Sequence, residues 1–430
     1  MEMGLERDVQ RAADRISEAD SVTIISHIDA DGISTESILA QALAREGIPA
    51  TSVFVRQLEP MAMRHIPDDD SLKIFTDLGA GQQALLEEHG LSADGVLIVD
   101  HHVSQPCGTA YPQVNCLDFG ITRMSAAGIA YMVARAIDSA NTDLAKLAVV
   151  GNVGDMMARE NCGLVGPARE IVQDGVEYGN VIVQRADLNC YGISTRPVHV
   201  CLGRCDDPYI DGISNSVTRA LRFLERLGVT LKTPRGGWLV WEEVPLDDRR
   251  TIISALTQQL IAHGREADRL LAETYIFPDE PERTPFRNAS EYATLLNACG
   301  RWAKPKVGGR ICRGDRGDAY REAEYMLAHH RSVIRGLLQY ILETGVTELS
   351  HLQYIHTGDR FPDTIVGIGA GMALSKLNWK KPIMVLAAMV DEPDVTKVSM
   401  RTNEWALARG VDLQAALDRC MKAYPVTTCS

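Results

Sequence analysis

The chain has 430 residues with 45% hydrophobic and 23% charged content, which is ordinary for a globular protein of two or three domains. The sequence lacks both a run of ~20 apolar residues that could cross a bilayer and the apolar core of a signal peptide. We therefore expect a cytoplasmic protein without membrane contact. The formal net charge of −13 excludes a broadly basic protein that coats nucleic acid, but it leaves room for a local basic groove.

Predicted strands and helices alternate over residues 1–160, after an amphipathic helix within residues 1–20. Strands are expected at 22–27, 51–55, 72–76, 96–99 and 114–117, and helices at 33–46, 80–89, 123–138 and 143–152. Such alternation predicts an α/β fold with a doubly wound parallel sheet.

The rest of the chain divides into two further regions. Residues 161–345 form a mainly helical region, with helices expected at 165–178, 217–227, 246–263, 289–299 and 319–343. Residues 346–430 return to an α/β pattern and predict a smaller domain. Its expected elements are strands at 365–368, 382–389 and 397–401, a helix opened by Gly369-Ala370-Gly371, and a last helix at 413–423.

Ten cysteines are scattered without a repeating spacing, which indicates reduced thiols in a cytoplasmic protein. Cys201 and Cys205 are close together, but no second Cys/His pair follows at zinc-site spacing. A structural zinc there is the weaker alternative.

Carboxylates and imidazoles follow three predicted strands, at the point where each strand ends. The residues are His27, Asp29 and Asp31 after the first strand, Asp77 after the third, and Asp100-His101-His102 after the fourth. Open α/β sheets bind ligands at this edge. If the chain stays extended after His27, the side chains of His27, Asp29 and Asp31 point to one side. Asp155, after an apolar helix, can close the site.

Six of these residues suffice to bind two ions that share Asp77: His27, Asp29, Asp31, Asp77, His101 and Asp155. Mixed imidazole and carboxylate ligands suit Mn²⁺, ahead of Mg²⁺, Co²⁺ or Zn²⁺, and paired ions serve phosphoryl chemistry. His102 is left as a supporting group, a phosphate donor or a general acid. A single Asp at a strand end is more often a cap, and a single His more often structural. Four such segments together favour the metal site.

Three weaker signals each have a structural alternative. The glycines of residues 367–371 suit a phosphate loop or a helix packed closely on a sheet. Ser399 and Arg401 suit a phosphate clamp or a surface strand end. Asn297, Arg301 and the basic residues Lys304, Lys306, Arg310, Arg313 and Arg316 suit a nucleic-acid groove or a solvated face.

With these motifs the chain resembles the DHH phosphoesterase family. The segment His27–Ile33 matches the first motif of that family and Asp77 the second. Asp100-His101-His102 matches the third motif, which names the family, and Asp155 the fourth. The segments 208–213, 295–301 and 365–372 resemble the archaeal RecJ-like single-strand nucleases.

The resemblance implies a manganese- or magnesium-dependent exonuclease on single-stranded DNA or RNA, in replication or repair, with GINS-type replication proteins as partners. It assigns His27, Asp29 and Asp77 to one ion, and Asp31, Asp77, His101 and Asp155 to the other. His102 would contact the scissile phosphate and Asp100 would orient the histidines. The C-terminal domain would be of the DHHA1 type, with Ser399 and Arg401 at its phosphate clamp. Arg301, from the basic run of the middle region, is a further candidate for substrate binding.

One departure affects the expected substrate. The DHHA1 domain normally ends with a glycine-rich loop, whereas this chain ends at residues 424–430 without it, so we expect an incomplete domain. Two alternatives therefore stay open. One is hydrolysis of a small phosphoester such as a nanoRNA, a cyclic dinucleotide or a bisphosphorylated nucleotide. The other is a scaffold role in the replication complex.

Overall fold

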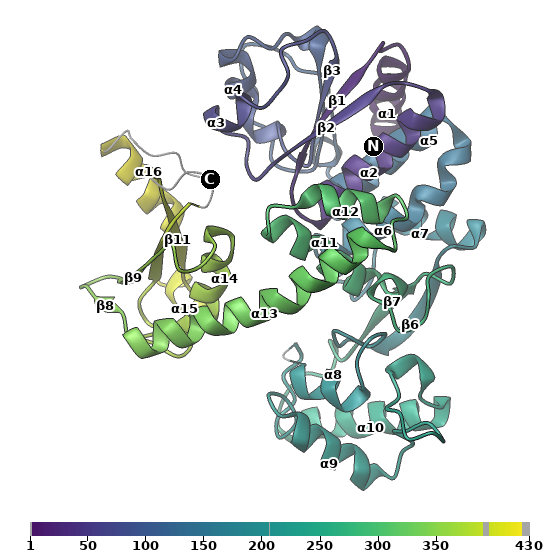
Figure 1. Ribbon diagram of the computed structural model, residues 1–430, viewed down its shortest axis with the longest axis vertical. Coiled ribbons are helices and arrows are strands. Elements are labelled where there is room, and N and C mark those ends of the chain that lie inside the picture. The colour runs from purple at the N-terminus through teal and green to yellow at the C-terminus, as the bar shows by residue number, and fades with distance from the viewer. Residues whose placement is uncertain (1, 206, 390–394, 424–430) are drawn as a thin grey trace. The chain divides into compact units, whose positions relative to one another are not determined.

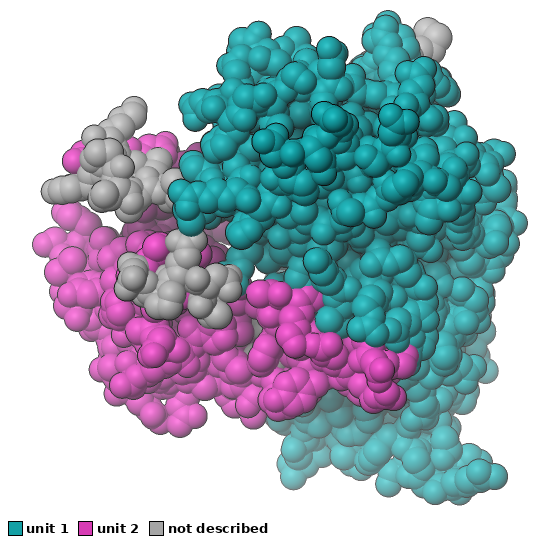
Figure 2. Space-filling view, turned by 45° about the horizontal axis from the view of Figure 1, so that its top comes forward, with its two compact units in different colours: residues 1–300, 305–316 teal, residues 301–304, 317–430 magenta. Residues whose placement is uncertain are grey.

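The computed structural model describes residues 2–205, 207–389 and 395–423, so the expectation about residues 424–430 lies outside it. Two compact units are present (Figure 2). The first contains residues 1–300 and 305–316, and the second residues 301–304 and 317–430. Among the described residues, no helix combines the length and the apolar character needed to cross a membrane.

A five-stranded parallel sheet forms the centre of the first unit (Figure 1). Its strands are β1 (Val22–His27), β2 (Ala50–Val55), β3 (Leu72–Thr76), β4 (Val96–Asp100) and β5 (Gln113–Asn115). Their order is β2-β1-β3-β4-β5, with every neighbouring pair parallel. The predicted α/β class with a parallel sheet is confirmed.

Helices cover both faces of this sheet. The helices on the faces are α1 (Glu2–Ser17), α2 (Ala30–Glu46), α3 (Pro60–Met63), α4 (Gln83–Glu88) and α5 (Ala126–Ile137). Helix α6 (Ala145–Gly154) packs on α2 and α5, and α7 (Pro167–Tyr178) packs on α6. On one face, α3 and α4 pack against Ile25, Phe75 and Ile98, all fully buried. The other face carries α1, α2 and α5, which contact β5, β1 and β4. Because both faces are covered, the strands read as continuous apolar runs.

The middle of the chain forms a helical cluster attached to an antiparallel ribbon. The ribbon pairs β6 (Ile182–Leu188) with β7 (Leu271–Ile276), and the helices are α8 (Val198–Arg204), α9 (Val217–Leu227) and α10 (Leu246–Ala262). Fully buried Trp241 lies in the cluster core, and its indole Nε1 donates to Asp187 Oδ1 at 2.5 Å. Sequence analysis gave no strands here, because β6 is largely exposed and so lacks an apolar alternation.

The remaining helices and a second sheet complete the fold. α11 (Ala289–Arg301) and α12 (Pro305–Cys312) precede the long α13 (Asp318–Thr344). The second sheet has the order β11-β10-β9-β8, from β8 (Thr347–Glu348), β9 (Gln353–Gly358), β10 (Ile383–Ala388) and β11 (Thr396–Arg401). Short helices α15 (Glu404–Leu407) and α16 (Leu413–Ala423) follow β11.

The predicted strand at 365–368 is wrong, because these residues lie inside helix α14 (Asp363–Leu374). Its β-branched residues suggested a strand, but Ile365 and Val366 are buried against α13 and β10. A Cβ on Gly369 would lie 2.3 Å from Leu337 Cδ2, so the glycine permits close packing of α14 on α13. The glycines of residues 367–371 therefore serve helix packing. In the second sheet, the strand next to β10 is instead β9.

Candidate metal centre

The parallel sheet brings the predicted ligands together at one edge. β1 pairs with β3, and β3 with β4, so the carboxyl ends of these three strands are neighbours. His27 is the last residue of β1, Asp77 directly follows β3, and Asp100 ends β4. Asp155 reaches this edge from the C-terminal end of α6.

The segment from His27 to Gly32 turns sharply, so the extended path expected for it is wrong. Asp29 is the N-cap of α2, where its Oδ1 accepts from the Gly32 backbone N at 3.0 Å. A Cβ on Gly32 would lie 2.3 Å from the His27 carbonyl oxygen, so only glycine fits this turn. Asp31 lies in the first helical turn. The side chains of Asp29 and Asp31 thus reach two different clusters.

Asp77 lies between those two clusters. Its Oδ2 is 3.3 Å from His27 Nδ1, which is also 3.2 Å from Asp29 Oδ1. Its Oδ1 is 3.3 Å from His101 Nε2. Each carboxylate oxygen of Asp77 therefore faces a different imidazole. Asp77 also has a φ of 58°, a left-handed conformation that is uncommon outside glycine and typical of functional sites.

The second cluster consists of Asp31, His101 and Asp155. His101 Nε2 is 3.5 Å from Asp155 Oδ2 and 3.8 Å from Asp31 Oδ2. The Asp31 carboxylate accepts from Ala126 N at 2.9 Å and Ala127 N at 3.0 Å, at the N-terminus of α5. Those backbone donors fix the carboxylate in place and favour its negative charge.

Asp100 supports the neighbouring loops. Its fully buried carboxylate accepts from His102 Nδ1 at 2.8 Å, from His101 N at 2.7 Å and from Ala80 N at 3.0 Å. The side chain of His102 is 57% exposed, and its Nδ1 bond to Asp100 leaves Nε2 available for another group. Asp100 thus orients His102.

The carboxylates are too crowded to be ionised together without added positive charge. Burial, and then the charges of Asp31 and Asp29, raise the pKa of Asp77 to about 7. Burial and Asp31 raise the pKa of Asp155 to about 6. Burial alone would lower the pKa of His101, but Asp77 and Asp31 outweigh it and raise that pKa to about 10. The cluster therefore holds protons where cations could bind.

The residues fit a divalent metal pair. Three groups of possible ligands have their donor atoms within 4.8 Å of one another: His27, Asp29 and Asp77; Asp31, His101 and Asp155; and Asp77, Asp100, His101 and His102. His101 Nε2 is buried and has no hydrogen-bond partner among the described residues. A buried orphan nitrogen beside carboxylates is the donor that a metal would use.

Helix α11 supports the first ligand loop, a contact that sequence analysis missed. Asn297 Oδ1 accepts from the Ala30 backbone N at 3.0 Å. A Cβ on Gly300 would lie 1.9 Å from the Ile28 carbonyl oxygen, so only glycine allows α11 to approach this closely. Sequence analysis offers Asn297 as a nucleic-acid contact, whereas in the structure its side chain holds the ligand loop. The signal that could have found it is the pair Asn297 and Gly300, three residues apart on one helix face.

The predicted basic groove at residues 301–316 is largely occupied by ion pairs. Arg313 Nη1 lies 3.1 Å from buried Glu36, and Arg316 Nε lies 3.0 Å from Glu280 Oε2. Two further pairs are Arg310 with Asp315 and Lys304 with Glu322. Spacing alone cannot show where the partners of a charge lie, because Glu36 and Glu280 are remote in sequence.

The three predicted substrate-binding residues lie in the second unit. Ser399 and Arg401 alternate along β11, and a Cβ on Gly367 of α14 would lie 2.7 Å from Arg401 Nη2 and 3.3 Å from Ser399 Oγ. The carbonyl of Arg301 accepts a hydrogen bond from Thr364 Oγ1 at 2.6 Å. Thr364 lies on α14, as does Gly367. Glycine in α14 thus lets the polar side chains of β11 lie against the helix.

Two family models match the chain. The model of the DHH family N-terminal domain matches residues 21–152, which hold the sheet and most of the ligands, and the DHH-CID domain matches residues 190–272. Residues 21–152 are thus identified as a DHH family N-terminal domain, in agreement with the motifs at His27–Ile33, Asp77 and Asp100-His101-His102.

Similar proteins share a RecJ-like fold with it. The uncharacterized protein MJ0831 of Methanocaldococcus jannaschii is 24% identical over 408 residues, covering 92% of this chain and 84% of its own. CDC45 from Entamoeba histolytica has a TM-score of 0.62 at 11% identity, covering 100% of this chain and 93% of that one. Exonuclease RecJ bound to manganese has a TM-score of 0.51 at 17% identity, covering 88% and 80%.

Proposed function

We propose that this protein is a two-metal phosphodiesterase that removes nucleotides from an end of single-stranded DNA or RNA. The observation that carries the proposal is the position of Asp77, whose two oxygens face the two imidazoles His27 and His101 at 3.3 Å each. A carboxylate placed in this way suits a bridge between two ions. The likeness of the fold to an exonuclease RecJ bound to manganese supports Mn²⁺ as the ion, with Mg²⁺ or Co²⁺ as substitutes.

In this proposal the ligands divide into two sets. His27, Asp29 and Asp77 hold one ion, and Asp31, Asp77, His101 and Asp155 hold the other. When bound, the ions supply a nucleophilic hydroxide and neutralise charge on the phosphate. Burial of Asp31 and Asp77 excludes water from the base of the site and strengthens their hold on cations.

The remaining site residues act on the substrate. His102, oriented by Asp100 through the 2.8 Å bond, donates from Nε2 to a non-bridging phosphate oxygen or protonates the leaving oxygen. Ser399, Arg401 and Arg301 bind phosphates further along the strand, where a guanidinium can form paired hydrogen bonds to one phosphate.

A nuclease assay on the full chain tests the proposal. Single-stranded DNA and RNA, labelled at the 5′ or the 3′ end, are incubated with Mn²⁺, Mg²⁺ or Co²⁺, beside a dinucleotide at equal concentration. Metal-dependent release of mononucleotides from the long strands is expected. If only the dinucleotide is cleaved, the substrate is a small phosphoester and not a polymer.

The matched variants are Asp77→Asn and Asp20→Asn. Asp20 is exposed and lies just before β1, at the opposite end of that strand from His27. Its variant therefore controls for the loss of one carboxylate away from the site. Asp20→Asn should retain full activity and Asp77→Asn should lose it. Full activity in Asp77→Asn would refute the metal-bridging role.

The second candidate function is a scaffold in a replication complex. It is favoured by the likeness to CDC45, which extends over all of this chain, and by the DHH-CID domain at residues 190–272. GINS-type replication proteins are the proposed partners. Retention of such partners by Asp77→Asn would support a scaffold role beside catalysis, whereas no retention by either wild type or variant would exclude it.

A further inference from the structure

Two buried thiols lie close together in the DHH-CID domain. Cys190 follows β6 and Cys205 directly follows α8, and their Sγ atoms are 2.9 Å apart. This distance is longer than the ~2.05 Å of a disulfide but shorter than ordinary packing of two sulfur atoms. Both are reduced thiols in this structure. The pair is therefore close to bonding distance without being bonded.

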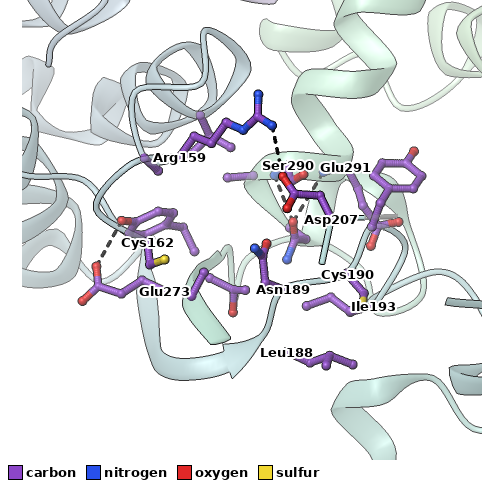
Figure 3. Close-up of a pocket in the computed structure, with 18 of the residues that line it drawn as sticks. Arg159, Cys162, Leu188, Asn189, Cys190, Ile193, Asp207, Glu273, Ser290 and Glu291 are labelled. Atoms are coloured by element: carbon purple, nitrogen blue, oxygen red, sulfur yellow. Dashed lines mark hydrogen bonds and ion pairs between the residues drawn. The ribbon is translucent and has the colours of Figure 1, made fainter. Parts of the chain in front are cut away.

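A cavity gives small molecules access to this pair. Its volume is about 690 Å³, and its lining includes both Cys190 and Cys205. The residues themselves are only 8% and 5% exposed, so a bulky reagent cannot approach them from bulk solvent. Figure 3 shows Cys190 on one side of the cavity and a third thiol, Cys162, on the other.

The chain on either side of the pair is anchored. Asn189 N donates to Leu270 O, and Asn189 Nδ2 donates to Arg269 O, both at 2.9 Å. On the other side, Cys205 N donates to Leu202 O at 3.3 Å at the end of α8. Bond formation needs the sulfurs to approach by only about 0.9 Å, which small side-chain rotations can supply without moving these anchors.

A metal does not explain the pair. Among the described residues, no group of three or more ligands within bonding reach contains Cys190, Cys201 or Cys205. Cys201, the other thiol of the weaker zinc prediction, instead donates to the Gly192 carbonyl at 3.0 Å. Within the part of the chain that the structure describes, the pair of thiols therefore suits oxidation better than zinc binding.

We propose that Cys190 and Cys205 are a redox-active pair that forms an intramolecular disulfide when a peroxide enters the cavity. One thiol loses its proton, and the thiolate attacks a peroxide oxygen. The O–O bond breaks, and the departing hydroxide takes up that proton, so that a sulfenic acid and water form. The second thiol then attacks the sulfenic sulfur, the S–S bond forms, and a second water leaves. Two thiols and one hydrogen peroxide thus give one disulfide and two waters. The proposal is independent of the metal centre.

Peptide mapping of the full chain tests this directly. The protein is treated with equimolar hydrogen peroxide, remaining thiols are blocked, and the chain is digested with trypsin. Cleavage after Arg204 separates Cys205 from the peptide that holds Cys190 and Cys201. A disulfide-linked pair of these peptides, two hydrogen masses lighter than their sum, is expected. The Cys201→Ser variant should give the same linked pair, which assigns the bond to Cys190.

Two further variants serve as controls. Cys190→Ser should abolish the linked peptide, and the wild type should lose two more thiols than this variant. Cys162→Ser removes a thiol from the same cavity and should leave the link unchanged. Since serine at a buried site could affect folding, the result on wild type and Cys201→Ser decides alone. Sulfinic or sulfonic acid at Cys190 or Cys205 without a link, or a link through Cys201, would overturn the proposal.

Discussion

The candidate metal centre and the basic segment of residues 304–316 differ in how far their charges are neutralised by partners within the protein. At the candidate metal centre, Asp31, Asp77 and Asp155 crowd together, and burial together with the neighbouring carboxylates raises their pKa values. In the basic segment, Arg313 and Arg316 each meet a buried carboxylate. A cluster of charges that the protein does not neutralise itself thus indicates a binding site for ions or ligands. Charges that are paired within the protein indicate a structural role.

The largest effect is expected when the shared carboxylate is removed. Asp77→Asn should lower nuclease activity roughly 10³-fold, or about 4 kcal/mol in the barrier, because a bridging charge is lost. Steady-state rates with Mn²⁺ measure this. Asn tolerates the left-handed backbone of residue 77, so circular dichroism should show a folded variant. An unfolded variant would instead assign Asp77 a structural role, and the metal centre would then not differ from the basic segment in this respect.

A smaller loss is expected from the group behind His102. Asp100→Asn removes the charge that orients His102, which should cost about 10–100-fold in activity, as for other groups that support a metal site. Burial raises the pKa of Asp100, but the hydrogen bond and charge of His102, together with the bond from the Ala80 backbone N, outweigh burial and lower that pKa. Isothermal titration of Mn²⁺ should change less than the rate does. Equal loss of metal affinity and rate would make Asp100 a ligand.

Glu280 tests the paired region. Its carboxylate accepts hydrogen bonds from Lys146 Nζ at 2.8 Å and from Arg316 Nε at 3.0 Å. Glu280→Gln should lower the free energy of unfolding by about 2 kcal/mol, because Arg316 loses its charged partner and Lys146 keeps only Asp279. Nuclease activity should stay unchanged. Urea denaturation measures the first and the nuclease assay the second.

The same residue sets a pH dependence. Burial raises the pKa of Glu280, but Arg316 and Lys146 outweigh it, so that pKa lies below its ordinary value of 4.5 in the folded protein. Its stabilisation is therefore full above pH 4.5 and is lost as the pH falls through the folded value. The gap in stability between wild type and Glu280→Gln should narrow on acidification; a gap that widens would contradict this.

The smallest effect is expected at Arg310, whose side chain is 50% exposed and pairs with Asp315. Arg310→Gln should change stability by less than about 1 kcal/mol, since exposed ion pairs contribute little. Binding of single-stranded DNA, measured by fluorescence anisotropy, should also stay the same. A strong loss of DNA binding would return this segment to the list of binding surfaces.

Sequence analysis predicted the sheet and brought six possible ligands to one edge, because strand ends can be found from apolar runs such as Val96–Val99. It failed where the outcome depends on packing. The path from His27 to Asp31 turns at Gly32, and β-branched residues 365–366 became helical against α13. Sequence analysis did not find the role of Asn297 either, since its partner Ala30 lies 267 residues away.

The left-handed backbone of Asp77 sets stability against function. Its φ of 58° lies in the left-handed region, which glycine adopts most easily, and its buried charge repels Asp29 and Asp31. Asp77→Gly would relieve both at once and leave an inactive chain. Directed evolution for heat resistance without selection for catalysis should therefore replace Asp77, because this residue serves activity and lowers the stability of the fold.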